Sequence, residues 1–287
     1  MRTKEEINEI CKLALQEYLN TQETDRSLTK LGVKYNIKRQ ILSERFKSWG
    51  YEIINQQNRT RLNESVFDTM DSEEQFYWLG FMFADGNISS EGHRIEVRLS
   101  IKDLSHLEKF RNFLQLSTEI RTGETNGNGW CHLSVRNKHL WEVLNSYGCV
   151  PQKSLILKFP RIALKSQKFL LDFIRGYVDG DGCLCIYQDE DKYRTRLSLL
   201  GTESFVTSVN KIFKNVGYIR NKSCENWANK AYELKFSDIP SRKIARYLYE
   251  NANIYLDRKY NKYLEFCRLE EESSRRLSSK IGGGLEC

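Results

Sequence analysis

Several patterns that assign proteins to common classes are missing from this sequence. Its eight cysteines include no CxxC pair, and its four histidines have no spacing typical of metal ligands. These absences argue against a zinc knuckle, a disulfide framework and a histidine-dependent nuclease site. No apolar run approaches the ~20 residues of a membrane span, and the N-terminus has no signal-peptide core. We therefore expect a soluble, intracellular protein with reduced cysteines and no membrane partner.

Positive charge is what the chain has in excess. Its 287 residues include 45 Lys and Arg against 38 Asp and Glu, which gives a formal net charge of +7. Because the basic residues are spread along the whole chain, the balance favours a polyanionic partner such as nucleic acid. The length suggests about two domains of roughly 100–200 residues each.

One stretch of sequence occurs twice. Residues 76–88 read FYWLGFMFADGNI and residues 173–186 read FIRGYVDGDGCLCI, and alignment on the last Asp-Gly places Asp85 over Asp181. In both copies a mostly apolar run of helical length leads to an acid, a glycine and residues that favour strands. The pattern predicts a buried helix, a carboxylate and a strand, in that order, in each half.

Each expected helix carries two small residues four positions apart. These are Gly80 with Ala84 in the first copy, and Gly176 with Gly180 in the second. A stripe of small residues lets the backbone of a partner helix come close, so we expect the two helices to pack together. Asp85 and Asp181 would then lie side by side at the negative ends of two helix dipoles. Because two carboxylates repel each other unless cations lie between them, the pattern predicts a divalent-metal site.

The nonapeptides WLGFMFADG and IRGYVDGDG resemble the motif of the LAGLIDADG family of homing endonucleases. The motif's glycine and its terminal Asp-Gly are present in both copies, and the resemblance extends over roughly residues 65–267. It implies a monomeric, site-specific endonuclease that cuts both strands of a long, pseudo-palindromic DNA target. The first copy departs from the pattern at Phe83, where the family usually has an acid that does not bind metal.

The resemblance also implies a metal site. Asp85 and Asp181 would bind Mg²⁺ or another divalent cation such as Mn²⁺, helped by the backbone carbonyls of Ala84 and Gly180. Ca²⁺ would support DNA binding without cleavage. Mg²⁺ prefers carboxylate, carbonyl and water oxygens, and it takes one or two protein carboxylates together with substrate phosphates. Two aspartates therefore supply the minimum that phosphodiester hydrolysis needs.

Two lysines complete the candidate catalytic set. Lys153 and Lys259 occupy equivalent places after the last helix of each half, where the family keeps a basic residue close to the scissile phosphate. Of the two we favour Lys153, because Arg258 competes with Lys259 in the second half.

The order of elements is duplicated as well. We expect an α+β protein in which αββαββα occurs twice, related by a pseudo-two-fold axis, with antiparallel DNA-binding sheets and a small all-α module before them. The expected ranges are 1–53 for the helix-turn-helix-like module, 54–64 for a linker, 65–160 and 161–272 for the two halves, and 273–287 for a tail that resembles an expression remnant.

The expected sheets have one polar face. Val97, Leu99 and Ile101 alternate with polar residues, the period of a half-buried strand. The polar faces would carry Arg94, Glu96, Arg98 and Arg136 in the first half, and Arg194, Arg196, Ser198, Asn221 and Lys235 in the second. A basic antiparallel sheet can lie along the major groove, where Arg and Asn read bases and Lys and Arg contact phosphates.

The N-terminal region resembles a helix-turn-helix unit. Residues 4–20 form an amphipathic pattern, Ser27 can cap a short helix, and residues 38–48 form the candidate recognition helix. The side chains expected to face DNA from that helix are Arg39, Gln40, Ser43, Glu44 and Lys47. The alternative is a three-helix packing module whose charged face is only solvated.

Two other functions remain open at this point. The same fold could serve a DNA-binding regulator that does not cleave, or an RNA maturase of the intron that encodes it. Asp85 and Asp181 together argue against the regulator, because a pure binder has no use for juxtaposed carboxylates. Nothing in the sequence excludes a maturase role. In each case we expect the protein to be located with its nucleic acid, in the cytoplasm of a bacterium or phage-infected cell, or in an organelle.

Overall fold

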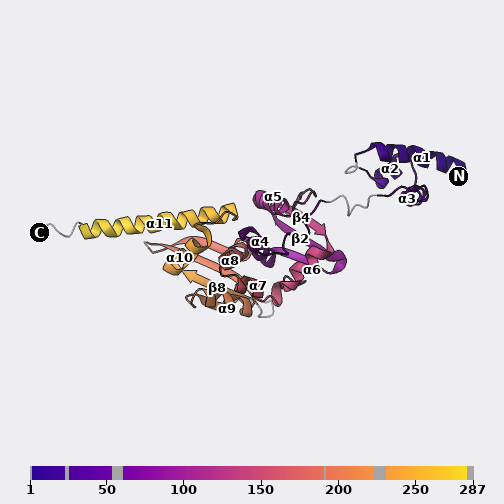
Figure 1. Cartoon of the computed structure of the whole chain (residues 1–287). Coiled ribbons are helices and arrows are strands. Elements are labelled where there is room, and N and C mark those ends of the chain that lie inside the picture. Colours follow the sequence, from indigo (N-terminus) through magenta and orange to yellow (C-terminus); the bar gives the residue numbers. More distant parts are fainter. Residues whose placement is uncertain (1, 23–25, 54–60, 191, 223–230, 283–287) are drawn as a thin grey trace. The chain divides into compact units, whose positions relative to one another are not determined.

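The chain forms two compact units, residues 1–61 and 62–287 (Figure 1). The computed structural model describes residues 2–22, 26–53, 61–190, 192–222 and 231–282, with side chains up to residue 272. Most of the expected linker and the end of the expected tail lie outside the described residues. Within the described part of the chain, no helix is long and apolar enough to cross a membrane.

Unit 1 is all-α. It consists of the helices α1 (Lys4–Asn20), α2 (Leu28–Lys34) and α3 (Arg39–Ser48). Thr3 and Glu6 form a capping box at the start of α1, and the Ser27 side chain caps α2 by accepting from the Lys30 N–H. The three helices enclose a core of their own, made of Cys11, Ala14, Leu15, Tyr18, Leu28, Leu31, Ile37, Leu42 and Phe46. The small all-α module expected before the duplicated part is therefore present.

The first half of unit 2 follows the expected order. Its elements are α4 (Glu73–Ala84), β1 (Gly86–Ser89), β2 (Arg94–Ser100), α5 (Leu104–Phe113), β3 (Arg121–Thr125), β4 (Asn128–Arg136) and α6 (Lys138–Ser146). The four strands form an antiparallel sheet in the order β1-β2-β4-β3. One detail of the expectation was wrong, because β2 ends at Ser100 and Ile101 starts a 3₁₀ turn in which its side chain is 39% exposed.

The second half repeats the same order. Its elements are α8 (Leu170–Asp181), β5 (Gly182–Asp189), β6 (Lys192–Gly201), α9 (Glu203–Ile212), β7 (Tyr218–Asn221), β8 (Tyr232–Ser237) and α10 (Asp238–Tyr249), with α7 (Arg161–Lys165) before them and α11 (Asp257–Gly282) after them. The sheet is again antiparallel, in the order β5-β6-β8-β7. The duplicated αββαββα arrangement is confirmed.

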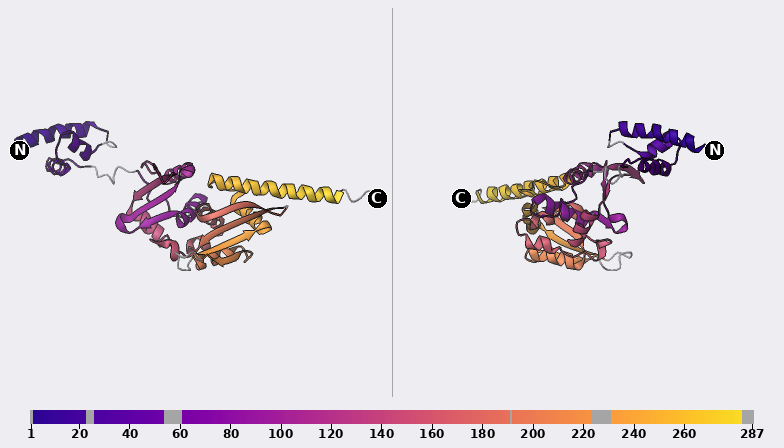
Figure 2. Two further views of the ribbon diagram at one scale, coloured as in Figure 1. Left: turned by 180° about the vertical axis from the view of Figure 1, so that it is seen from behind. Right: turned by 45° about the vertical axis from the view of Figure 1, so that its right-hand side comes forward.

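Helices α4 and α8 pack against each other at the centre of unit 2, between the two sheets (Figures 1 and 2). A Cβ added to Gly80 would lie 2.0 Å from the carbonyl oxygen of Phe173, and one added to Gly176 would lie 1.9 Å from that of Tyr77. At the end of the pair, a Cβ on Gly180 would lie 2.3 Å from the Cβ of Ala84. The small-residue stripes therefore bring the two backbones into contact, as expected.

A buried arginine fastens the other end of the helix pair. Arg175 of α8 is 2% exposed, and its guanidinium lies 2.7 Å from Glu73 of α4 and 2.8 Å from Asp172. It also donates to the backbone carbonyls of Leu248 and Ile254, each at 2.9 Å. This set of contacts ties the beginnings of α4 and α8 to the segment that joins α10 to α11.

We expect Gly80→Ala to destabilise unit 2 far more than an ordinary Gly→Ala change. The new methyl would meet a backbone carbonyl rather than a flexible side chain, and overpacking of this kind costs about 1–3 kcal/mol or more. Gly127→Ala is the matched control, since Gly127 has a positive φ of 75° but open space around it, so that only backbone strain of about 1 kcal/mol is added. Urea unfolding measures both; equal losses would show that the helix contact is not tight.

Candidate active site and nucleic-acid interface

The two aspartates of the repeated motif meet at the ends of the central helices. Asp85 is the residue that caps the C-terminus of α4, and Asp181 is the last residue of α8. A Cβ on Gly180 would lie 3.4 Å from the Cγ of Asp85. Each aspartate is followed at once by a glycine that begins an edge strand, β1 or β5. The structure therefore brings the two carboxylates together at the border between the sheets.

The surroundings of both carboxylates raise their pKa values. Burial, followed by the negative charge of Asp181, raises the pKa of Asp85 from 3.8 to about 6. The side chain of Asp181 is exposed overall, yet its carboxylate loses solvation among packed protein atoms and its pKa is also raised. Lys153 and Lys259 act in the opposite direction on both groups. Two carboxylates held in this way form a site that a cation would stabilise.

The two candidate lysines are not equivalent. Lys259 is 4% exposed, and its ammonium donates to the carbonyls of Val178, Asp179 and Gly180 at 2.5, 2.6 and 3.2 Å. Burial lowers its pKa to about 8, although the nearby carboxylates raise it. Lys259 therefore caps the C-terminal end of α8. One of its hydrogen bonds goes to the Gly180 carbonyl, which we expected to bind metal.

Lys153 lies in a more open position. It is half-buried, donates to the Gly86 carbonyl and lines the same hollow as Asp181. Arg258, the expected competitor of Lys259, is instead bound to Asp103, with its Nε 3.0 Å from the carboxylate. The sequence favoured Lys153 because Arg258 was expected to compete with Lys259. The structure gives a different reason, which is that Lys259 is buried.

A buried acid that sequence reasoning passed over supports this end of α8. Asp179 is fully buried and accepts hydrogen bonds from the hydroxyls of Tyr77 and Tyr249 at 2.7 and 2.6 Å and from the Leu256 N–H at 2.7 Å. It holds the start of α11, and with it Lys259, against the helix. The sequence did offer a sign of this role, because Asp179 is an acid at the sixth position of the motif, where the first copy has Phe83.

The site fits a hard divalent cation. Among the described residues there is no cluster of three His, Cys, Asp or Glu side chains that could hold a metal. In phosphoryl-transfer sites Mg²⁺ is bound by one or two carboxylates together with water and phosphate oxygens, and Asp85 and Asp181 supply two such carboxylates. The Ala84 carbonyl stays a prediction as a metal ligand.

The polar face of the first sheet is built around Glu96. In register, Arg94 lies opposite Arg136, and Arg98 lies opposite His132. The Glu96 carboxylate accepts from Asn87 at 2.8 Å and lies 3.5 Å from Arg94 and 3.4 Å from His132. Glu96 therefore partly neutralises the centre of this face, including Arg94.

Aromatic and basic side chains share the far end of that face. Arg98 is exposed, and its guanidinium lies over the Trp130 ring at 4.4 Å. Arg121 of the edge strand β3 joins the same row opposite His132, a position that the sequence reasoning missed. Arginine stacked on an aromatic ring is held in one orientation, which suits directed hydrogen bonding.

Two expected members of the second polar face are placed differently. Ser198 is only 7% exposed, because it lies between Cys183 and Lys235 in register. Asn221 pairs with Tyr232 and so belongs to the opposite face of the sheet, since partners in register share a face. The corresponding place on the polar face belongs to Arg220, which is 2.8 Å from Glu233.

The remaining cations of this face are partly neutralised. Arg194 lies 3.3 Å from Asp189 and 3.2 Å from Asp238, and Lys235 lies 3.7 Å from Glu233. Arg196 is half-buried, and its guanidinium lies 5.3 Å from the centre of the Tyr187 ring. Arg196 is thus the counterpart of Arg98, with an aromatic neighbour on the same face.

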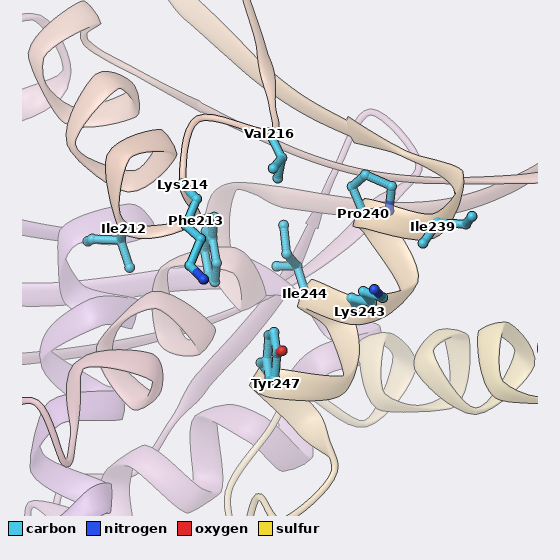
Figure 3. Close-up of a pocket in the computed structure, with 9 residues that line it drawn as sticks. All are labelled: Ile212, Phe213, Lys214, Val216, Ile239, Pro240, Lys243, Ile244 and Tyr247. Atoms are coloured by element: carbon cyan, nitrogen blue, oxygen red, sulfur yellow. The ribbon is translucent and has the colours of Figure 1, made fainter.

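One hollow of the molecule stands apart from these residues. Figure 3 shows it around the end of α9 and the first turns of α10, lined by Ile212, Phe213, Lys214, Val216, Ile239, Pro240, Lys243, Ile244 and Tyr247. The lining is mainly apolar, and it includes neither aspartate nor any residue of the two polar faces. We therefore do not assign it to the candidate site.

Comparison with known proteins gives a likeness in structure. No protein-family model matches the sequence, and no curated protein matches it either. Among solved structures, the I-LtrWI LAGLIDADG homing endonuclease bound to target DNA is 12% identical over 74% of this chain and 92% of that chain, with a TM-score of 0.48. The LAGLIDADG meganuclease I-AabMI bound to uncleaved DNA is 12% identical over 70% and 91%, with a TM-score of 0.49. I-SmaMI, bound to an uncleaved DNA target in the presence of calcium ions, is 12% identical over 74% and 99%, with a TM-score of 0.45.

We expect the stability of the protein to depend on pH because the pKa of Asp85 is raised. Its native pKa of about 6 lies above the usual 3.8, so the native state holds a proton that the unfolded state has already lost, and stability falls as pH rises from about 4 to 6. Asp85→Asn should remove the contribution of Asp85 to this fall and raise the Tm near pH 7.5 when EDTA is present, by a few degrees; the contribution of Asp181, whose pKa is also raised, remains.

The matched control is Asp68→Asn, at a surface carboxylate bonded to His139, which should keep the wild-type profile. Addition of Mg²⁺ should raise the Tm of the wild type and of this control, since a ligand that binds only the folded state stabilises it. An unchanged pH profile in Asp85→Asn would contradict the assignment of strain to this carboxylate.

Proposed function

We propose that residues 62–287 form a site-specific, divalent-metal-dependent endonuclease that cuts both strands of duplex DNA. The observation that carries the proposal is the meeting of Asp85 and Asp181, the same position of a duplicated motif, at adjoining helix ends. Each aspartate leads directly into a sheet with cations on its polar face. Burial raises the pKa of both carboxylates, and a carboxylate pair held in this way has a physical use when a cation and a phosphate are bound.

The two aspartates and the residues around them have different roles in this proposal. Asp85 and Asp181 would hold a divalent cation, and the chemistry that it would supply there is the activation of water and the neutralisation of charge on the phosphate and the leaving oxygen. Lys153 presents its ammonium beside Asp181, where it can attract and orient a phosphate oxygen. Lys259 and Asp179 keep the end of α8 in place, so they act through the position of Asp181.

DNA binding belongs to the two polar faces. The candidate contacts are Arg94, Arg98, Arg121 and Arg136 in the first half, and Arg194, Arg196, Arg220 and Lys235 in the second. Because duplicated modules mirror the two-fold symmetry of DNA, one chain can bind one continuous target with two half-sites. The two faces differ in residues, so the half-sites should differ in sequence.

Substitution of either aspartate tests the catalytic assignment. Asp85→Asn and Asp181→Asn keep the size of the side chain but remove the charge that holds the cation, so cleavage of a plasmid that carries a target selected from a randomised library should fall by orders of magnitude. Binding of the same target should persist or improve, because one fewer carboxylate faces the phosphates. Asp68→Asn should cut normally.

The products of these variants separate the possible arrangements. Loss of both cuts in each variant agrees with one cation site shared by the two aspartates, which the contact of Gly180 with Ala84 favours. Accumulation of nicked circles would contradict the shared site. Full double-strand cutting by either variant, or a wild type that binds the target but never cuts it with Mg²⁺ or Mn²⁺, would contradict the nuclease and favour a DNA-binding regulator.

Arg98 should read sequence. Arg98→Ala should weaken binding by about 1–3 kcal/mol and relax the preference at one target position, since that is the usual effect of losing a base contact in the groove. Arg246→Ala on the outer side of α10, where it pairs with Glu270 at 2.7 Å, is the matched control. Selection from a randomised target measures both, and a uniform loss across all sequences would place Arg98 on a phosphate.

A further inference from the structure

Charge is segregated within unit 1. Helix α1 carries four acidic and two basic residues, whereas residues 28–48, which cover α2 and α3, carry six basic residues and one acid, Glu44. The core of unit 1 does not require this division, because buried positions in all three helices are apolar. The α2–α3 side of the unit is therefore a basic surface on a module whose other helix is acidic.

Several cations of that surface have no ion pair among the described residues. Lys34 of α2 is neutralised by Glu17 of α1 at 2.6 Å, and within α1 Lys12 pairs with Glu9 at 2.8 Å. The side chains of Lys30, Lys38, Arg39 and Lys47 are exposed and form no ion pair with any described residue. Unpaired cations gathered on one side of a small module raise its potential toward a polyanion.

Helix α3 presents polar side chains beside its buried stripe. Leu42 and Phe46 are fully buried in the core of unit 1. Arg39, Gln40 and Lys47 are exposed. Their spacing places Gln40 and Lys47 away from the buried stripe and Arg39, in the first turn, next to it. A cation thus lies near each end of α3, and between them the Gln40 amide donates to Glu44 at 3.2 Å.

We propose that the surface formed by Lys30, Lys38, Arg39, Gln40 and Lys47 is a second binding site for duplex DNA. An exposed helix of this size fits the major groove, where a glutamine can pair with adenine and the flanking cations can contact phosphates. A single-stranded partner is disfavoured, because that mode of binding depends on exposed aromatic rings for stacking, and the five residues include none. The proposal concerns unit 1 and holds whether or not unit 2 cleaves DNA.

A second site on the same chain changes how the protein holds DNA. Binding at one unit makes binding at the other an intramolecular event, so a weak site in unit 1 still raises the overall affinity for a long duplex. Each phosphate that a cation contacts also adds about 0.9 to the slope of log K against log salt. The salt slope therefore reports this surface without knowledge of its preferred sequence.

The test compares two double variants of the full chain that each remove two positive charges. Arg39→Ala with Lys47→Ala changes the proposed surface, and Lys4→Ala with Lys12→Ala changes α1. Binding of a fluorescent, mixed-sequence 40-base-pair duplex is followed by anisotropy over a range of NaCl concentrations, in EDTA so that no cleavage occurs. The first variant should bind several-fold more weakly and lose almost 2 from the salt slope; the second should keep the wild-type slope.

The other outcomes overturn the proposal. Equal slopes in the two variants would show that the effect is one of net charge, and an effect seen with a single-stranded RNA of equal length but not with the duplex would assign the surface to RNA. Circular dichroism at the unfolding transition of each variant confirms that unit 1 stays folded. Because binding is measured in EDTA, where no cleavage occurs, a failure here is distinct from a failure of the proposed nuclease.

Discussion

The contact of α4 with α8 at Gly80 and Gly176 is the constraint on which the rest of unit 2 depends. Each glycine faces a backbone carbonyl of the opposite helix, so no side chain separates the two backbones. Because Asp85 ends one helix and Asp181 ends the other, the same approach brings the carboxylates together. Strands β1 and β5 start at the next residue, so the position of each sheet edge is set by the helix pair as well.

The electrostatics of the pair differ at its two ends. At the beginning of the helices, acids are favourable next to the positive ends of the dipoles, and Glu73 and Asp172 share the buried guanidinium of Arg175. At the other end two acids meet the negative ends of both dipoles, and burial raises the pKa of each. The fold therefore satisfies its charges where the helices begin and leaves them unsatisfied where the sheets begin, which is where a dication and a phosphate would be useful.

Much of this arrangement could be predicted from the sequence because it depends on local periodicity. The repeated apolar run, its small residues and its Asp-Gly ending specify the helix pair and the carboxylates, and the period of two specifies which residues of β2 are polar. The predictions that were wrong concerned the register of a strand or the burial of a side chain. Asn221 was placed on the wrong face because the start of the edge strand β7 sets its parity, and the burial of Ser198 and Lys259 follows from neighbours in other elements. The network of Asp179 needs donors from α4, α10 and the start of α11, which no local pattern reveals.

The duplication has also produced two unequal helix ends. In the second half the end of α8 is fixed by Asp179 and by three carbonyls bonded to Lys259. In the first half the position equivalent to Asp179 is occupied by Phe83, which packs on Phe173 with ring centres 5.3 Å apart. There Lys153 contacts one carbonyl, that of Gly86. Movement of Lys259 toward a phosphate would break several hydrogen bonds within a buried network, whereas movement of the half-buried Lys153 would break one. Two strands of DNA bound across this site would therefore meet different surroundings, although the chain that forms them repeats the same order of helices and strands.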